Sequence, residues 1–453
     1  MVIVLALAAC SNSGPPPVKV LASFDAGESA TFRPPDAGIA AGDSELLEAT
    51  NSGVHLLDRK GFQIGPPATT NVLFGSVVAR NAHLSDPRVA WDPAGRRFLI
   101  VMFDFLRRPP CATQAQCGDR LLVAVSRGAR PRGFSASDWM VDAEPMSSPG
   151  AQFIQSVDFP SMAVTPDTLV VTLNAEAVLP GNGGGSPHER VRLIDLAALE
   201  RDPHGAPYHD LDDLRDAEGR GGVSNVMPAM GAGGVVLVMT DSDCRVRLWQ
   251  VEDPLGSPKA VAAIAGRSGS CGDALNASQP GKVSSLEVDG PRFHSRPSMR
   301  DGRLWVVQTV SGPGRLAEMH WIELDVSRFP NVAVLNDGRL AASDASVFYP
   351  AVQAGPDGSA VIVYARSGAK EKVTVEVTGR ARADQPGTLR PPAALHVSEA
   401  VQETAVGDPS QRNRFGDYYD TSPDPDGRTA WVTGEYIRAP EQWSMWVGRV
   451  SLA

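Results

Sequence analysis

Seven short apolar runs recur along the chain, and each is followed by a second run in which apolar and polar residues alternate. Arg245–Val251, which reads R-V-R-L-W-Q-V, shows the alternation most clearly. A period of two residues predicts a β-strand with one covered face and one wetter face. The first runs begin roughly 64 residues apart on average, which is typical of a repeat architecture. They are Leu46–Ser52, Arg97–Phe103, Leu169–Ala175, Val235–Ser242, Leu304–Val310, Ala360–Arg366 and Ala430–Tyr436.

A proline-centred phrase precedes five of these runs, as in S-D-P-R-V at 85–89 and S-R-P-S-M at 295–299. Proline is tolerated as the first residue of a strand because its missing N–H falls outside the hydrogen-bond ladder. Turns rich in Asp, Pro and Gly, such as G-P-D-G at 355–358, separate the phrase from the run. These residues favour hairpins, so each unit predicts an inner strand, a second strand and a third strand joined by tight turns.

This pattern predicts an all-β, single-domain, seven-bladed β-propeller. Because the seventh unit ends at its third strand, Lys19–Phe24 is expected to supply the outer strand of the last blade and close the ring. Two β-sandwiches joined near residue 220 are the alternative. Outer strands of other blades are expected at Asn71–Val77, Lys259–Ile264, Asn331–Asn336 and Ala394–Glu399.

Three phrases resemble a loosely defined group of secreted bacterial β-propeller proteins: I-A-A-G at 39–42, D-P-R-V-A-W-D-P at 86–93 and G-D-Y-Y-D-T-S-P-D-P at 416–425. This resemblance covers most of the chain and implies the fold and export, not a reaction. The segment 422–431 also looks like a stretched Asp-box of the sialidases, S-x-D-x-G-x-T-W with two extra residues. In that family the Asp-box forms a turn remote from catalysis, so this match too implies only fold.

Composition places the chain among globular proteins, because 42% of its 453 residues are hydrophobic and 21% are charged. Its formal net charge is −10. No Lys- or Arg-rich block is present, which argues against nucleic acid as a partner.

The first residues, M-V-I-V-L-A-L-A-A-C, resemble the lipobox of bacterial lipoproteins, although no Lys or Arg precedes Lys19. The resemblance implies a signal peptide over residues 1–9 and a lipid-modified Cys10 that begins a tether over residues 10–17. The propeller then spans 18–453. The expected location is the bacterial cell envelope, anchored to the outer membrane or secreted, with the membrane as a partner through the lipid. An unmodified Cys10 in an ordinary secretory signal is the alternative.

The remaining four cysteines are Cys111, Cys117, Cys244 and Cys271. An even number suits an oxidising compartment, and local pairing of Cys111 with Cys117 and of Cys244 with Cys271 is the simplest arrangement. A metal site is the competing interpretation, but no C-x-x-C motif or nearby His pair supports it.

In a propeller, loops and strand starts from several blades meet at the mouth of the central channel, where ligands bind. Three of the acidic residues expected there, Asp86, Asp158 and Asp417, could hold Ca²⁺ through oxygen ligands. Each could equally cap a turn or bond to the backbone of a neighbouring blade. The candidate binding residues at the mouth are Asp36, Asp86, Arg88, Asp158, Asn225, Arg296, Tyr349, Asp417 and Tyr418.

The favoured function is that of an envelope-anchored binding or scaffold module for carbohydrate, peptide or an envelope protein. A glycan hydrolase of sialidase type is the alternative, with Arg296 and Tyr418 or Tyr419 in the roles that the resemblance implies. Such an enzyme needs three arginines around the substrate carboxylate and an acidic residue as proton donor, with Arg88 and Arg414 as the other candidates. A purely structural lipoprotein is a third possibility, and the sequence assigns no catalytic residue.

Overall fold

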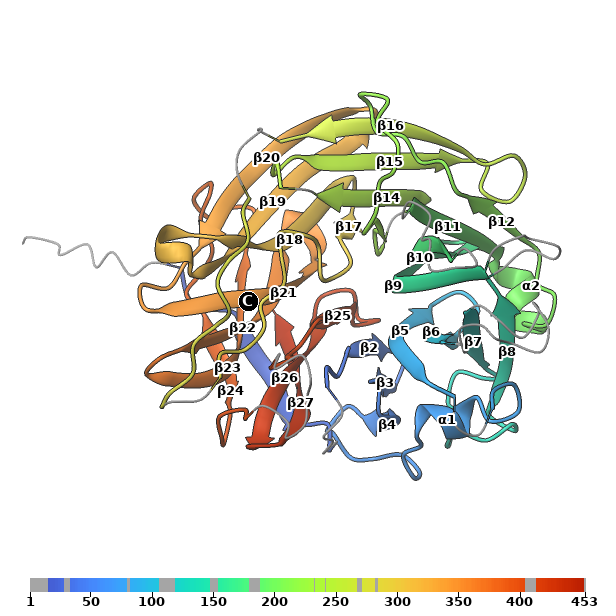
Figure 1. Ribbon diagram of the computed structural model, residues 1–453, viewed down its shortest axis with the longest axis horizontal. Coiled ribbons are helices and arrows are strands. Elements are labelled where there is room, and N and C mark those ends of the chain that lie inside the picture. The colour runs from blue at the N-terminus through green and yellow to red at the C-terminus, as the bar shows by residue number, and fades with distance from the viewer. Residues whose placement is uncertain are drawn as a thin grey trace, which may run out of the picture.

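Seven small antiparallel sheets stand around a common centre and form a seven-bladed β-propeller in a single domain (Figure 1). The computed structural model describes residues 15–27, 33–79, 82–105, 119–146, 154–178, 188–231, 233–240, 242–266, 271–281, 284–403 and 413–451. Among these residues no helix has the length and apolar character needed to cross a membrane.

Blades 1 to 4 follow one another along the first half of the chain. Blade 1 contains β2 (Gly38–Ala41), β3 (Glu45–Ala49) and β4 (Val54–Asp58). Blade 2 contains β5 (Leu84–Asp92), β6 (Arg97–Asp104), β7 (Arg120–Ser126) and β8 (Trp139–Pro145). Blade 3 contains β9 (Ile154–Val164), β10 (Thr168–Val178), β11 (His188–Asp195) and β12 (Tyr208–Leu211). Blade 4 contains β13 (Met227–Pro228), β14 (Val235–Thr240), β15 (Val246–Glu252) and β16 (Lys259–Ala265).

The second half of the chain forms blades 5 to 7. Blade 5 contains β17 (Ser298–Arg300), β18 (Arg303–Ser311), β19 (Ala317–Arg328) and β20 (Asn331–Leu340). Blade 6 contains β21 (Ala345–Ala354), β22 (Ala360–Gly368), β23 (Glu371–Arg380) and β24 (Ala393–Val397). Blade 7 contains β25 (Asp420–Pro423), β26 (Ala430–Ala439), β27 (Gln442–Ser451) and β1 (Lys19–Asp25).

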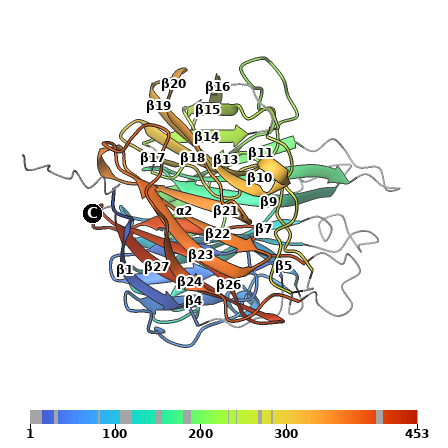
Figure 2. The same cartoon turned by 90° about the vertical axis from the view of Figure 1, so that its left-hand side faces the viewer.

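The two ends of the described chain close the ring. Strand β1 pairs antiparallel with β27, from Lys19 opposite Ser451 to Asp25 opposite Trp446. Figure 2 shows the two strands side by side. The predicted closure of the last blade by the N-terminal strand is therefore confirmed, and the alternative of two β-sandwiches is wrong.

Both faces of the middle strands are buried, because each blade packs against its two neighbours. All six residues of β14 are buried, as are seven of the eight in β6. This is why the first runs read as continuous apolar stretches and not as an alternation. The largest buried side chains between the blades are the indoles of Trp139, Trp249, Trp305, Trp321, Trp431 and Trp443.

The outer strands predicted from the sequence are confirmed, with one exception. The segment predicted as a strand at Asn71–Val77 contains the short helix α1 (Thr70–Leu73), and blade 1 has three strands. Leu73 and Phe74 are buried there in the cluster that Phe98 and Ile100 of blade 2 also join. Apolar side chains therefore cover the outer side of the blade without a fourth strand. The other helical segments in the described part of the chain are α2 (Leu196–Arg201) and two short turns, η2 (Pro313–Arg315) and η3 (Pro356–Gly358).

Cys244 and Cys271 form a disulfide, with Cα atoms 5.3 Å apart. This predicted pair is confirmed. Cys10, Cys111 and Cys117 lie outside the described residues, as does most of the predicted signal and tether.

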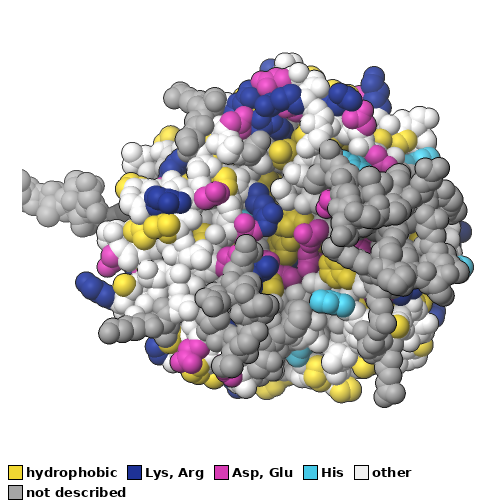
Figure 3. Space-filling model, in the orientation of Figure 1, with side chains coloured by type: hydrophobic (Ala, Val, Ile, Leu, Met, Phe, Trp, Pro, Cys, Tyr) yellow, Lys and Arg dark blue, Asp and Glu magenta, His cyan; other side chains and the backbone are white. Residues whose placement is uncertain are grey.

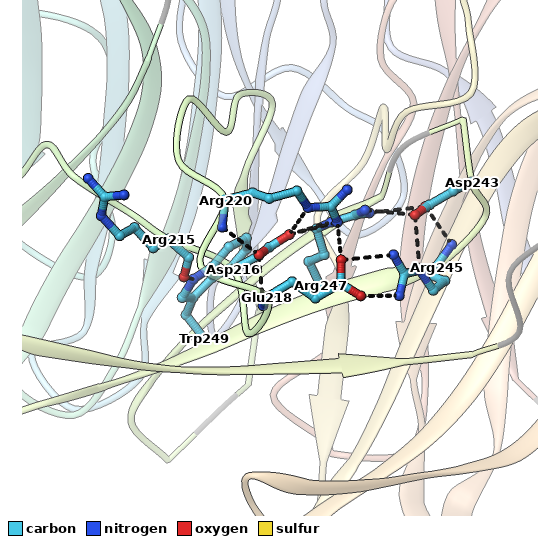
Figure 4. A network of polar contacts seen from close by, with 8 residues as sticks. All are labelled: Arg215, Asp216, Glu218, Arg220, Asp243, Arg245, Arg247 and Trp249. Carbon is cyan, nitrogen blue, oxygen red and sulfur yellow. Dashed lines mark hydrogen bonds and ion pairs between the residues drawn. The ribbon is translucent and has the colours of Figure 1, made fainter.

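A network of ion pairs surrounds the disulfide turn of blade 4 (Figure 4). Arg247 donates to both carboxylate oxygens of Asp243, at 3.0 and 2.7 Å, and to Asp216 at 3.3 Å. Arg245 bonds to Asp243 at 3.0 Å and to Glu218 at 2.6 Å. The network therefore ties the loop before β13 to the turn between β14 and β15.

Candidate functional site

The same backbone bend recurs where the inner strands begin. Six non-glycine residues there, one in each of six blades, have φ between 49° and 59°. In blades 2, 3 and 6 the bend coincides with a shift of register between the inner and second strands. Such bulges redirect side chains, and in blades 2 and 3 the residues at the bulge, Asp86 and Phe159, line the channel mouth. The six residues are Asp36, Asp86, Phe159, Asn225, Tyr349 and Asp417.

A cavity of about 390 Å³ opens at this mouth. Figure 3 shows acidic side chains gathered around it in the middle of the face. Of the nine residues predicted for the mouth, five line the cavity: Asp36, Asp86, Asp158, Asp417 and Tyr418. The other lining residues are Pro34, Asn51, Ser85, Phe105, Phe159, Glu287, Asp289, Arg292, His294 and Arg414.

On the side of blades 1 and 2, Asn51 fixes two carboxyl groups next to each other. Its side-chain nitrogen donates to Asp36 Oδ2 at 2.6 Å, and its side-chain oxygen accepts from the backbone N–H of Asp86 at 2.7 Å. Ser85 Oγ donates to Asp86 Oδ1 at 2.7 Å. The two aspartates are therefore held in place by neutral partners.

Three carboxyl groups of the cavity, those of Asp36, Asp158 and Asp417, have raised pKa values. Burial raises the pKa of Asp36 well above its usual value, and Asp86 and Asp417 raise it further by repulsion. Burial and the charge of Asp86 also raise the pKa of Asp158. Burial raises the pKa of Asp417 to about 7, against the opposing effect of Arg414. The cavity thus has too little positive charge to balance its carboxyl groups.

The opposite wall carries ion pairs. Arg414 contacts Asp417, and its Nε lies 3.1 Å from Glu287 Oε2. Arg292 pairs with Asp289. Both arginines are therefore already engaged by acidic partners.

His294 lies at the edge of this wall and is 1% exposed. Burial and the charge of Arg292 lower its pKa to about 4. The imidazole is therefore neutral at physiological pH, and it adds no positive charge to the cavity.

Tyr418 lines the cavity, and Arg88, which is not a lining residue, lies against the Tyr418 ring. The Arg88 guanidinium carbon lies 3.4 Å from the centroid of the Tyr418 ring, a cation–π contact. Arg88 Nε donates to the carbonyl of Pro160 in blade 3 at 2.8 Å. Burial raises the pKa of Tyr418, and the Asp86 carboxylate adds to this shift, so its hydroxyl stays protonated.

Deeper in the channel, Arg296 takes a structural position instead of the predicted one at the mouth. Its Nη2 donates to both oxygens of Asp420, and its Nη1 donates to the carbonyls of Val89 and Met162 at 3.0 and 3.3 Å. Beyond it, a second and more apolar cavity of about 320 Å³ opens at the other end of the inner strands. Arg296 lines this second cavity.

Two further predicted residues lie outside the acidic cavity. Asn225 exchanges hydrogen bonds with Asn174 at 2.9 and 2.8 Å and so joins blades 4 and 3. The Tyr349 ring is fully buried against Phe348 and Phe415, and its hydroxyl reaches the carbonyl of Glu287 at 3.3 Å. Both side chains therefore make contacts within the fold and do not line the acidic cavity.

The described residues do not form the expected calcium site. Within the described ranges, no three His, Cys, Asp or Glu side chains come together in a group that could hold a metal ion. Asp86, Asp158 and Asp417 line one cavity, but Asp417 is directed to Arg414 and Asp158 Oδ1 accepts from the N–H of Phe159 at 2.8 Å.

Sequence reasoning missed the wall made by Glu287, Asp289 and Arg292. These residues belong to the long connection between β16 and β17, which has no strand periodicity and no proline-centred phrase. The signal that was available is the run E-V-D-G-P-R at 287–292, which places three charged residues next to a turn-forming pair.

The Asp-box-like segment forms the turn between β25 and β26. Asp424 Oδ2 accepts from the Trp431 indole at 2.8 Å, and Asp424 Oδ1 accepts from the N–H of Asp426 at 3.0 Å. Asp424 lines the second cavity and not the acidic one. Its position is that of a blade-stabilising turn.

No family model matches the chain, and no curated protein sequence matches it either. Solved structures with a similar arrangement include sialidases and neuraminidases at low identity. The hemagglutinin-neuraminidase of parainfluenza virus 5 is 10% identical, with a TM-score of 0.46 over 97% of this chain and 95% of that one. The NanB sialidase from Streptococcus pneumoniae is 8% identical, with a TM-score of 0.42 over 90% of this chain and 82% of that one.

A Trypanosoma rangeli sialidase is also similar, at 8% identity and a TM-score of 0.39. The match covers 80% of this chain and 54% of that one, so the chain spans little more than half of its length. A likeness of this size says nothing about the function of this chain.

Proposed function

We propose that this protein is a binding module whose acidic cavity takes a hydroxyl-rich ligand without negative charge, such as a neutral or basic carbohydrate. The observation that carries this proposal is a cavity lined by six carboxyl groups and only two guanidinium groups, with the rings of Phe159 and Tyr418 beside them. Carboxylates accept hydrogen bonds from sugar hydroxyls, and aromatic rings pack against the C–H groups of a sugar.

The engagement of the arginines argues for this function over a sialidase-like hydrolase. A sialidase needs guanidinium groups that are free to hold a substrate carboxylate. Arg296 is paired with Asp420, and Arg414 is paired with Asp417 and Glu287. Arg88 is stacked on Tyr418, the candidate nucleophile. An anionic sugar would therefore meet a surplus of negative charge.

A panel of neutral, basic and acidic oligosaccharides, titrated calorimetrically against the purified protein, tests the proposal. We expect at least one neutral or basic sugar to bind and acidic sugars to bind less. Asp158→Asn should weaken the interaction. Asp301→Asn is the matched control, because Asp301 lies in an exposed turn of blade 5, where its side chain is 79% exposed. Preferential binding of sialylated sugars would contradict the proposal, and so would binding of no sugar.

We further propose that the domain is tethered to the cell envelope through a lipid on Cys10, with residues 11–17 as the spacer. The sequence resemblance at residues 7–10 supports this proposal. Labelling cells with a palmitate analogue should mark the wild type and not Cys10→Ser. Equal labelling of both would overturn the anchor while leaving the binding function untouched.

A further inference from the structure

We infer that the second cavity, at the other end of the inner strands, is a separate binding site for a small, neutral and largely apolar molecule that carries a carbonyl oxygen. This site goes beyond the proposed function, because the two cavities have no lining residue in common. The inference is carried by the chemistry of the cavity wall and by two buried hydrogen-bond donors that lack an acceptor.

The wall of the second cavity is mostly apolar. Its volume of about 320 Å³ is in the range of small-molecule sites, which combine an apolar wall with a few polar groups. Blades 1 to 4 supply most of the apolar side chains, which include Ile39, Val89, Trp91, Ala163, Val164 and Met230. The cavity therefore suits a ligand with an apolar body.

The acidic residues at this wall already have cationic partners. Asp43 forms an ion pair with Arg96. Asp424 forms an ion pair with Arg59 and lies 3.2 Å from Arg449 Nε. A cationic ligand would therefore compete with arginines that these carboxylates already hold.

Two N–H groups at the wall have no acceptor among the described residues: Arg296 Nε and Trp91 Nε1. The Arg296 side chain is 4% exposed, and its other nitrogens bind Asp420 and backbone carbonyls. One of these carbonyls belongs to Val89, two residues before Trp91 in β5. A buried donor without an acceptor is costly, because it has lost water and gained nothing in exchange. Since both groups are donors, the ligand atom that complements them is an acceptor.

A carbonyl oxygen meets this requirement better than the other acceptors. It has two lone pairs and no proton, so it can accept from more than one donor. A hydroxyl would bring a further donor to a wall whose buried, unpartnered side-chain groups are both donors. A carboxylate would add negative charge beside Asp43 and Asp424, whereas the charge of Arg296 is already balanced by an ion pair.

Benzophenone and diphenylmethane test the inference, because they differ only in a carbonyl group that replaces a methylene group. Equilibrium dialysis against the full chain gives a dissociation constant for each compound. We expect benzophenone to bind at least about tenfold more tightly, equivalent to about 1.4 kcal/mol. Diphenylacetate, which carries a carboxylate beside the same two rings, should bind more weakly than benzophenone.

A substitution of Trp91 tests the role of its N–H group. Trp91→Phe removes this donor and keeps an aromatic ring next to Phe98, whose ring centroid lies 4.7 Å from that of Trp91. It should remove most of the preference for benzophenone and leave diphenylmethane able to bind. Trp446→Phe is the matched control, because the Trp446 indole belongs to blade 7 and donates to Ser23. This control should keep the preference.

A second substitution locates the site. Val164→Phe places a larger side chain in the cavity wall and should weaken the binding of both compounds about tenfold or more. Val334→Phe is the matched control, because Val334 is 43% exposed in β20. Circular dichroism and thermal melting identify any variant that has not folded, and the comparison of the compounds on the wild type needs no variant.

The outcomes are distinct from those for the acidic cavity. Equal or tighter binding of diphenylmethane or diphenylacetate would overturn the inference, and so would the absence of binding by benzophenone. A preference for benzophenone that is undiminished in both Trp91→Phe and Val164→Phe would also overturn it. The panel of sugars tests the acidic cavity separately, so failure of one proposal leaves the other standing.

Discussion

Arg296 of blade 5 and Asp420 of blade 7 form an ion pair in the middle of the channel, with Arg296 Nη2 at 2.8 and 2.6 Å from the two carboxylate oxygens. Asp420 Oδ2 also accepts from the N–H of Ile39 in blade 1, at 3.0 Å. The pair thus joins three blades that are far apart in the sequence. Their side chains are 4% and 7% exposed, so each charge depends on the other.

Removal of this arginine should strongly destabilise the fold. Arg296→Met leaves the Asp420 carboxylate buried without a cation, and we expect a loss of about 3–5 kcal/mol in the free energy of unfolding. Urea denaturation measures the change. Arg215→Met is the control, because Arg215 and Asp213 form an exposed pair, at 61% and 71%, that should contribute under about 1 kcal/mol.

The double variant Arg296→Met/Asp420→Leu completes this test. Replacing both charges by apolar groups should recover part of the stability that the single variant loses. If Arg296→Met were as stable as Arg215→Met, the pair would have no structural role in the channel.

The closure of the ring gives a second prediction. A chain that lacks residues 1–25 loses the hydrogen bonds of β1 to β27 and the bond of the Trp446 indole to Ser23 Oγ at 2.7 Å. Strand β27 then becomes an open edge, which favours association with other chains. We expect a melting temperature several degrees lower and a tendency to aggregate, seen by calorimetry and light scattering.

A chain that begins at Pro15 is the control for this deletion, since it keeps every contact of β1. It should melt like the full-length protein. Equal stability of both truncated chains would show that the last blade does not need its outer strand.

The fold could be predicted because its signals are local. Proline at the entrance of an inner strand, as at Pro87, and the alternation of Arg245–Val251 recur often enough to count the blades. The helix α1 was missed because β-propensity in N-V-L-F-G-S-V gave no sign that a helical turn would cover blade 1. Apolar residues at the edge of a sheet are compatible with an outer strand and with a short covering helix.

The site could be predicted only where it follows the repeat. Asp36, Asp86, Asp158 and Asp417 could be found because each lies just before an inner strand or in its first half. The direction of a side chain at the same repeat position depends on its partners elsewhere in the sequence. Arg296 points into the channel because Asp420 lies there, 124 residues away. A local sequence pattern cannot show that two residues so far apart in the chain form a pair.

The disulfide gives a third prediction. Cys244 and Cys271 close a loop with a sequence separation of 27, and Cys271 is fully buried. A crosslink of this length restricts the unfolded chain by about 3–4 kcal/mol. Cys244→Ser/Cys271→Ser should therefore melt at a lower temperature than the wild type. A reducing agent should lower the wild-type melting temperature toward that of the variant and leave the variant nearly unchanged.

The ion-pair network next to this disulfide limits how much stability is lost when the disulfide is removed. Arg247 and Asp243 hold the same turn, and they do not depend on the oxidation state of Cys244. We expect the double serine variant to keep its overall fold, as judged by far-ultraviolet circular dichroism. Loss of the β signal at room temperature would contradict this view of the network.

The buried Glu435 makes stability depend on pH. Its side chain is fully buried, Oε2 accepts from the N–H of Gly416, and burial raises its pKa to about 8 from a usual value of 4.5. The folded state therefore holds a proton that the unfolded state releases between these two values. Stability contributed by this group is present in full below pH 4.5 and is lost as the pH rises through 8.

Glu435→Gln should flatten this dependence, because an amide has no proton to release and its oxygen can still accept from Gly416. The free energy of unfolding, measured by urea denaturation from pH 5 to 8, should fall less steeply in this variant than in the wild type. The difference in slope should approach about 1.4 kcal/mol per pH unit. Glu252→Gln, at an exposed position of β15, should keep the wild-type slope. Equal slopes for wild type and Glu435→Gln would mean that Glu435 is already ionised in the folded protein.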